Sequence, residues 1–492
     1  MRALDSARAE QSAEVTATLL ELQKCFEDLV VRGVKSAGPD DVKHLQALGE
    51  EFGRSGAAYV ARVVDELVRA AREGDDGAAR ALLRAQTASR VFERVLSLDA
   101  AVEAFFDGSE LAPARKPKQE LPALEDRAAL VPLLRELAEV VEGLVSSGLT
   151  TASAATRQKL DASAKEAARS KLGRLSASLR YVNDELGRFL DESEHFSARR
   201  LAFFLNRTWL ISRGLEEAIA EEDRAALSRL LWQTAPTPVK SLSVVTVGVQ
   251  KRALLDGSAS FDFRFRVVKG SAELPTGTRL VWSTVFSGKK GVPAEAFLHL
   301  PQVQKFNPKL LLDPTEVLVT DAAVTLDEFG SGRLMLGPKS TVKPGPPFTA
   351  WESVVSWDPK RALERARAHQ ASPLDLEVEL QEELVVTDWE LSPGATNPNR
   401  REQQIFPLRF GALELDATAS TGPDGEELAK ALKGFLKKGA KRPKLYGLLH
   451  YELCRLVFQP LSAFDGDGPP KHLMISSEKI DLASLMKTLD FS

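Results

Sequence analysis

Apolar residues recur at helical spacing through the first half of the chain. Steps of three and four separate Val15, Leu19, Leu22 and Phe26, and the pattern ends at Gly33. The same spacing returns in later segments up to about residue 235, so we expect a helical N-terminal half. The further helices are predicted near residues 40–53, 59–74, 82–96, 130–145, 197–215 and 224–232.

One stretch of this half predicts a much longer helix. Residues 153–192 contain no proline, and glycine occurs there only as Gly173 and Gly187. About 40 residues would make a rod of about 60 Å. A narrow apolar stripe of this kind suits packing against partner helices of the same chain, with an intermolecular coiled coil as the alternative. The stripe consists of Leu160, Ala164, Ala168, Leu172, Leu175, Leu179, Val182, Leu186 and Leu190.

The period of the pattern changes to two after Pro236 and Pro238. Residues 260–267 alternate phenylalanines with charged side chains, which is typical of a half-buried strand. This alternation sends the phenylalanines inward, away from Arg264 and Arg266. Short strands separated by turns predict a small antiparallel barrel or sandwich. The other strands are expected at residues 242–249, 279–287, 296–300, 316–325 and 333–336.

The last part of the chain mixes both periods. Strands are predicted at residues 374–380, 405–410 and 413–417, and helices at residues 425–438 and 481–489. Residues 445–460 favour a hairpin, with a helix as the alternative. The expected fold class is therefore α+β multidomain: an N-terminal helical bundle with one long helix, then a small antiparallel β barrel or sandwich, then a terminal α+β unit.

Proline-rich stretches suggest the domain boundaries. Ser109–Pro122 carries three prolines and no apolar period, which is typical of a linker. Asp358 followed by Pro359 starts a short connecting helix. The expected divisions are a helical subdomain at 1–108, a linker at 109–122, a helical bundle at 123–235, an antiparallel β domain at 237–348, a connecting helix at 349–371 and an α+β domain at 372–492.

Composition narrows the functional classes. The chain of 492 residues carries 65 basic and 69 acidic side chains, which argues against a generally basic nucleic-acid binder. Its two cysteines, Cys25 and Cys454, lie far apart, so neither a disulfide framework nor a disulfide-linked partner is expected. The first residues do not resemble a signal peptide, and no apolar run is long enough to span a bilayer. We expect a soluble, cytoplasmic protein without a membrane partner.

The densest basic cluster lies within residues 430–444. If the predicted helix continued, Lys430, Lys433, Lys437 and Lys441 would lie along one side of it and could contact phosphates. A solvated helix face is the simpler interpretation. The candidate polyanion-binding residues are Lys430, Lys433, Lys437, Lys441, Arg442 and Lys444.

Other candidate chemistry is weaker. His450 and Cys454 are four apart and could form a metal pair or a Cys/His dyad on a helix, but a zinc site needs at least three protein ligands. Asp465–Gly468 resembles the start of a calcium loop, yet Ser476 stands where that loop needs a glutamate. We expect no catalytic residue, cofactor or metal site. The acidic residues Glu377, Glu379, Glu382, Glu383, Asp388 and Glu390 are expected on a solvated face.

These patterns favour a non-catalytic scaffold or adaptor of a cytoplasmic assembly, with other proteins as partners. A nucleic-acid-associated protein that uses the β domain and the basic cluster at Lys430–Lys444 is the first alternative. An enzyme whose site is assembled from dispersed residues is the second.

Overall fold

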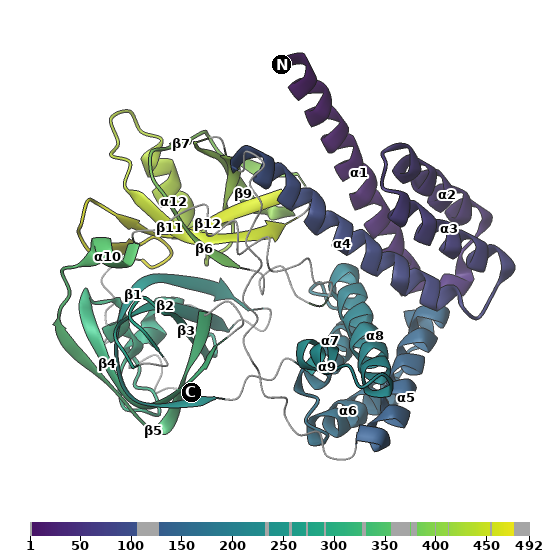
Figure 1. The fold of residues 1–492 in the computed structure, drawn as a ribbon, viewed down its shortest axis with the longest axis horizontal. Helices are drawn as coiled ribbons and strands as arrows, with labels where there is room; N and C mark the ends of the chain where they lie inside the picture. The colour runs from purple at the N-terminus through teal and green to yellow at the C-terminus, as the bar shows by residue number, and fades with distance from the viewer. Residues whose placement is uncertain are drawn as a thin grey trace. The chain divides into compact units, whose positions relative to one another are not determined.

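The chain folds into two compact units. The computed structural model describes residues 2–105, 127–231, 236–254, 258–271, 274–289, 292–326, 331–355, 374, 381–398, 400–411, 413–452 and 455–476. The helical unit comprises Met1–Leu96, Lys118–Gln233 and Ala371–Leu376, and the β unit comprises the remaining segments. Figure 1 draws the first half of the chain as helices and the second half mainly as strands, which confirms the expected order of the two kinds of structure.

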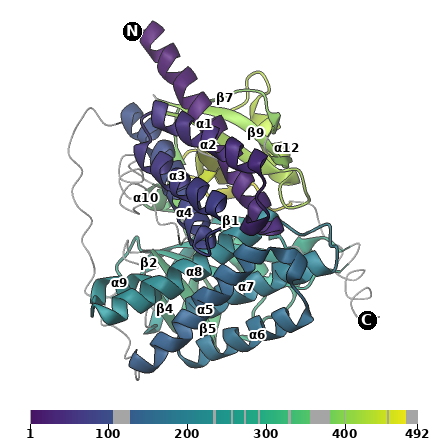
Figure 2. The same ribbon diagram turned by 90° about the vertical axis from the view of Figure 1, so that its right-hand side faces the viewer.

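Helices α1 to α9 follow one another from the N-terminus (Figures 1 and 2). Gly33 ends α1 with a φ of 89°, a conformation that favours glycine. Ser197 caps α8, at the start of the helix predicted near residues 197–215, because its hydroxyl accepts a hydrogen bond from the Arg200 N–H at 3.2 Å. The helices are α1 (Arg2–Arg32), α2 (Pro39–Arg54), α3 (Ala58–Glu73), α4 (Ala78–Phe105), α5 (Arg127–Ser147), α6 (Ala154–Arg169), α7 (Gly173–Leu190), α8 (Ala198–Ala220) and α9 (Arg224–Leu231).

The prediction of one long helix at residues 153–192 is wrong. The chain turns between α6 and α7, where Lys171 has a φ of 59°. The Leu172 N–H donates to the Ala167 carbonyl at 2.8 Å and the Lys171 N–H donates to the Ala168 carbonyl at 3.1 Å. These two bonds form a Schellman motif, which satisfies the last carbonyls of α6 and ends the helix.

The apolar stripe of the predicted rod lies instead between the two short helices. Leu160 on α6 and both Leu175 and Leu179 on α7 are at most 1% exposed. The Ser176 hydroxyl donates to the Ala164 carbonyl at 2.7 Å, so α6 and α7 pack closely. A continuous apolar stripe is therefore compatible with a helical hairpin, because its α6 half and its α7 half pack against each other.

The first sheet of the β unit is a closed five-stranded barrel in the order β1-β2-β3-β5-β4 (Figure 1). All neighbouring pairs are antiparallel except β3 and β5, which are parallel. Alternating directions cannot close a ring with an odd number of strands, so one parallel pair is required. The expected barrel is confirmed, but it is not wholly antiparallel. Its strands are β1 (Thr237–Ala253), β2 (Ala259–Lys269), β3 (Arg279–Phe286), β4 (Thr315–Leu326) and β5 (Ser331–Pro347).

One predicted strand of the barrel is wrong. Residues 296–299 of the predicted strand at 296–300 belong to a 3-10 helix, η3 (Ala294–His299), and a second one, η4 (Pro308–Leu312), follows it. Between them, Phe306 packs on Trp282 of β3 at 5.6 Å between ring centroids. The apolar residues of this connection therefore pack against the barrel core but do not form a strand of the sheet.

The second sheet follows the short helix α10 (Trp351–Val355) and has eight strands. The hairpin alternative for residues 445–460 is confirmed, since β11 and β12 pair antiparallel. Helix α12 (Glu426–Phe435) packs on this sheet through Leu428 and Leu432. The strands are β6 (Glu382–Val386), β7 (Trp389–Leu391), β8 (Ala395–Asn397), β9 (Arg400–Phe410), β10 (Leu413–Ser420), β11 (Lys444–Glu452), β12 (Arg455–Phe464) and β13 (Pro470–His472).

Strand β1 connects the two sheets of the β unit because its two faces lie in different cores. Val244 and Val249 belong to the barrel interior, and Val245 and Val247 belong to the core shared with the second sheet. The predicted linker at 109–122, the helices at 358–369 and 481–489, and the strand at 374–380 lie outside the described residues, apart from Leu374.

Candidate functional site

The basic cluster at Lys430–Lys444 is spread over three kinds of structure. Only Lys430 and Lys433 lie on α12, because the helix ends at Phe435. Lys437 and Lys441 lie in the connection that follows, and Lys444 begins β11. The expected stripe of four lysines along one helix is therefore wrong, since the chain leaves the helix before reaching Lys437.

Several members of this cluster make contacts within the β unit. Lys430 lies 3.8 Å from Glu427, and Lys441 lies 3.3 Å from Asp465; both lysines and Asp465 are exposed, and Glu427 is partly buried. Arg442 donates a hydrogen bond to the Trp389 carbonyl at 2.9 Å, and its guanidinium lies 5.8 Å from the centre of that ring. Arg442 thus covers a core tryptophan, whereas Lys433, Lys437 and Lys438 remain exposed.

A group of buried charged residues lies between the barrel and the second sheet. The phenylalanines of β2 point into the barrel as expected. The arginines on the opposite face of β2 are not solvated, because Arg264 is 8% and Arg266 is 2% exposed. We define the arginine seam as Arg264, Arg266 and Arg279 of the barrel together with Glu382 and Glu383 of β6.

Ion pairs connect the two sides of the arginine seam. Arg266 Nη2 lies 2.5 Å from Glu383 Oε2, and Arg279 Nη1 lies 2.9 Å from Glu382 Oε2. Arg264 Nη1 lies 3.7 Å from Glu383 Oε1. The expectation that Glu382 and Glu383 lie on a solvated face is therefore wrong, because they are 2% and 4% exposed. Their adjacent positions at the start of an apolar run were the available sequence signal.

The electrostatics of the seam favour charged carboxylates. Burial opposes ionisation of Glu383, but Arg266, Arg279 and Arg264 together hold the pKa of its carboxyl below the usual value. Beside it, Tyr446 packs on Gly248, and burial raises the pKa of its phenol, with a further contribution from Glu383. An ionised Glu383 among three arginines and a protonated Tyr446 beside it form a buried ion-pair network.

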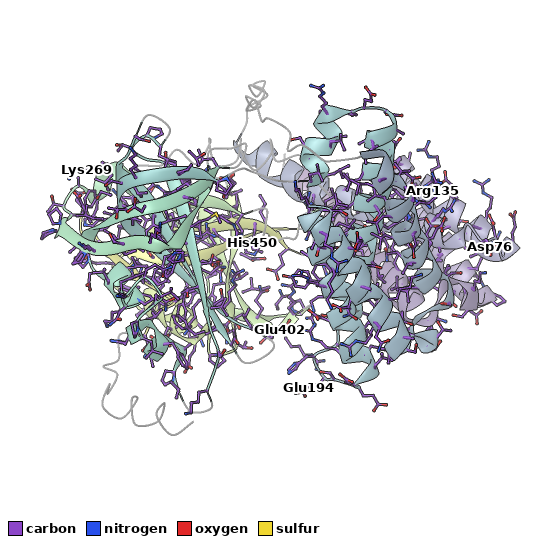
Figure 3. All side chains as sticks on the ribbon, turned by 90° about the horizontal axis from the view of Figure 1, so that it is seen from below. Asp76, Arg135, Glu194, Lys269, Glu402 and His450 are labelled. Carbon is purple, nitrogen blue, oxygen red and sulfur yellow. The ribbon has the colours of Figure 1, made fainter. Side chains whose placement is uncertain are left out.

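A second ionic cluster surrounds Glu452 at the end of β11. Burial opposes its ionisation, but His450, Arg400 and Gln403 lower the pKa of Glu452 to about 2. His450 Nε2 lies 3.6 Å from Glu452 Oε2. His450 therefore lies on a strand and faces a carboxylate, whereas Cys454 lies outside the described residues. Figure 3 labels His450 and Glu402 on the second sheet and Lys269 on the barrel.

The other candidate metal site is a surface turn. Asp465–Gly468 connects β12 to β13, and the Gly468 N–H donates to the Asp465 carbonyl at 3.3 Å. Within the part of the chain that the structure describes, no group of three or more His, Cys, Asp or Glu side chains is placed to hold a metal ion.

Three exposed apolar residues lie in the segments around the point where β3 and β5 separate. The two strands pair only from Arg279 to Val281, and the connection between β3 and β4 lies beyond this point. There the Thr284 hydroxyl donates to Gln302 Oε1 at 3.5 Å, and Gln304 Nε2 donates to the Leu336 carbonyl at 3.1 Å. We define the apolar rim as the exposed residues next to these contacts: Val285 (58% exposed), Val303 (78%) and Met335 (46%).

Comparisons with known proteins do not place the chain in a family. No protein-family model matches the sequence, and no curated protein matches it. Among the described residues, none of the helices is long and apolar enough to span a bilayer.

Proposed function

We propose that this protein is a non-catalytic scaffold or adaptor whose β unit binds a protein partner through the apolar rim. The observation that carries the proposal is the position of Val303. Gln302 and Gln304 on either side of it bond through their side chains to β3 and β5, and the Gln302 N–H donates to the Phe306 carbonyl at 2.8 Å, so this exposed apolar side chain lies on a hydrogen-bonded connection. A preorganised apolar anchor lowers the entropic cost of binding a partner.

The composition of the rim supports a protein partner. Val285 and Met335 flank Val303 on the two strands, and the contacts of their neighbours bring all three positions to one end of the barrel. Apolar side chains that a partner buries contribute affinity in proportion to the area removed from water. The buried carboxylates of the unit support the non-catalytic part of the proposal. Glu382, Glu383 and Glu452 each form an ion pair with an arginine inside the fold.

The test is affinity purification of the full chain from its native host with a matched pair of variants. Val303→Asp places a charge in the proposed contact, so the parent should retain a stoichiometric partner that this variant loses. Leu254→Asp is the control, since Leu254 is also an exposed apolar residue of a barrel connection, at 38% exposure. Retention of the same partner at equal yield by Val303→Asp and the parent would contradict the proposal.

The nucleic-acid alternative rests on the exposed lysines of the basic cluster. Lys433, Lys437 and Lys438 are exposed and lie close together in sequence, so a polyanion could reach them. The neutralisation experiment described in the Discussion tests this alternative separately, because it changes no residue of the apolar rim.

A further inference from the structure

The helical unit contains the same succession of four helices twice. Helix α2 occupies residues 39–54 and α6 occupies residues 154–169, so both ends of the two helices are 115 positions apart. Helix α1 ends at Arg32 and α5 ends at Ser147, with the same separation. Helices α3 and α7 also begin 115 positions apart. We define copy 1 as α1 to α4 and copy 2 as α5 to α8.

The turns within the two copies agree in their backbone conformation. Gly56 between α2 and α3 has a φ of 86°, and Lys171, 115 positions later between α6 and α7, has a φ of 59°. The Ala57 N–H donates to the Phe52 carbonyl at 2.9 Å, which is the counterpart of the bond that Leu172 makes at the end of α6. The left-handed conformation of Lys171 therefore belongs to a turn that occurs in both copies.

Buried residues recur with the same separation. In copy 1 they lie on the inner faces of α1 and α2, and the residue 115 positions later is of the same type and is also buried. A pattern that repeats at a fixed separation along successive helices is the signature of an internal repeat. The matched pairs include Leu22 and Leu137, Leu29 and Leu144, Val30 and Val145, and Leu45 and Leu160.

The two copies meet through the turns that follow α1 and α5. Gly33 and Gly148 stand 115 positions apart in these turns, and both have a positive φ. A Cβ on Gly33 would overlap the backbone carbonyl of Ser147, and a Cβ on Gly148 would overlap the backbone carbonyl of Arg32. Because Arg32 and Ser147 are themselves counterparts, each contact is the image of the other. Such reciprocity is the mark of a two-fold axis between the copies.

The same axis passes between α4 and α8. Thr87 of α4 and Asn206 of α8 are 119 positions apart, and buried residues recur along these helices with that separation, Leu82 and Leu201 among them. The Asn206 amide donates to the Thr87 hydroxyl at 3.2 Å and to the Leu83 carbonyl at 2.7 Å. Counterparts that bond to each other lie at the axis, since only there does a residue face its own image.

Charged residues cross between the copies in the same way. Arg80 of α4 forms an ion pair with Glu142 of α5, with 2.8 Å between Nε and Oε2. The counterparts of these two residues are Arg199 of α8 and Glu27 of α1, which interact electrostatically. The same pair of residue types therefore occurs twice across the interface, once on each side of the axis.

We propose that the helical unit is an internal dimer, in which two copies of one four-helix repeat bind each other through a two-fold interface. Each copy contributes the turn after its first helix and the inner face of its fourth helix. A surface of this kind is complementary to its own image, so the partner that fits it is another such repeat. Here the second copy in the chain supplies that partner, and the interface does not involve the apolar rim.

The deciding experiment exchanges the two residues at the axis in the full chain. Asn206→Thr removes the donor to the Leu83 carbonyl and should lower the melting temperature of the helical signal by about 2–4 °C. Adding Thr87→Asn should restore it, because a two-fold axis places the new amide opposite the Ala202 carbonyl, the image of that of Leu83. The control adds Arg84→Asn instead, on the exposed face of α4, and should restore nothing.

The two glycines provide an independent measurement. Gly33→Ala and Gly148→Ala should each lower the melting temperature more than Gly74→Ala, whose φ of 65° is also left-handed but whose Cβ would meet no atom within 4 Å. Both methyl groups would push the same two turns apart. The double variant should therefore lose clearly less than the sum of the two single losses.

Two results would overturn the proposal. One is an exchange of Thr87 and Asn206 that is no more stable than Asn206→Thr alone, because the two positions would then not be images of each other. The other is additive losses at Gly33 and Gly148, which would mean that the two turns do not share a contact. Neither result bears on the adaptor function, because the purification experiment changes Val303 in the β unit.

Discussion

Arg266 on β2 and Glu383 on β6 join the barrel to the second sheet through a buried ion pair, with 2.5 Å between Nη2 and Oε2. The two side chains are 2% and 4% exposed, so neither has water to replace its partner. Because β2 also sends its phenylalanines into the barrel, this strand is buried on both faces. The pair therefore contributes, with Arg279 and Glu382, to the contact between the two sheets of the β unit.

Removing one charge of this pair should destabilise the β unit strongly. Glu383→Gln keeps the shape of the side chain but leaves Arg266 without its counter-ion, at an expected cost of about 3–5 kcal/mol. The control is Glu390→Gln, whose partner Arg409 is as exposed as Glu390 itself, at 59%. That exposed pair should contribute less than about 1 kcal/mol. Urea unfolding of both variants measures the difference, and equal costs would show that the seam is hydrated.

The contact between Gly248 and Tyr446 should tolerate no added methyl group. A Cβ on Gly248 would lie 2.5 Å from Tyr446 Cε1, whereas a Cβ on Gly337 of β5 would meet no atom within 4 Å. We expect Gly248→Ala to lower the free energy of unfolding by about 1–3 kcal/mol through overpacking. Gly337→Ala should be close to neutral in the same thermal unfolding experiment. A neutral Gly248→Ala would mean that the two sheets separate easily.

The turn between α6 and α7 should accept glycine in place of Lys171. A left-handed conformation costs an L-residue about 1–2 kcal/mol, so Lys171→Gly should raise stability by up to about 1 kcal/mol. Lys165→Gly in the interior of α6 should instead lower stability by about 1 kcal/mol. Denaturant unfolding compares the two. A loss of stability in both variants would indicate a continuous helix through residue 171.

Acid should destabilise the second sheet in two steps. Burial lowers the pKa of His472 from 6.5 to about 4, so the folded state binds its proton less readily and stability falls as the pH drops from about 6.5 to about 4. Glu452, with a pKa lowered from 4.5 to about 2, loses its contribution as the pH falls from about 4.5 to about 2. His472→Asn should flatten the first step in urea unfolding between pH 7 and pH 4. An unchanged slope in that variant would assign the first step to other groups.

Neutralising the exposed lysines tests the polyanion hypothesis. If Lys433, Lys437 and Lys441 contact phosphates, changing all three to Gln should reduce the salt slope of duplex DNA binding by about 2.7, at roughly 0.9 per contact. We expect instead that the parent does not bind DNA at physiological salt and that the triple variant unfolds like the parent. Tight, salt-sensitive binding that the variant loses would support the nucleic-acid alternative over the adaptor.

Much of the local structure could be predicted from the sequence. Gly33 ends α1 and Ser197 begins α8, because glycine conformation and hydroxyl capping act within a few residues. The alternation in β2 predicts the inward phenylalanines, because a strand sends successive side chains to opposite faces. The turn at Lys171 was missed because its residues carry no glycine at the left-handed position, and helix propensity alone favours continuation.

The candidate sites depended more on distant contacts. The sequence shows that basic residues are dense within 430–444. It does not show that α12 ends at Phe435, before Lys437. Glu382 and Glu383 were assigned to a solvated face, although they meet Arg279 and Arg266 more than a hundred positions away in the chain.

The sequence by itself determined where most helices and strands of this protein form and which of their apolar faces are buried, because these depend on the period of side chains along a short segment. Only the tertiary structure decided which charges are buried. An arginine on the outer face of a strand looks the same in sequence whether water or a second sheet covers it. Its environment depends on the partner that the fold places opposite, and for Arg266 that partner is Glu383.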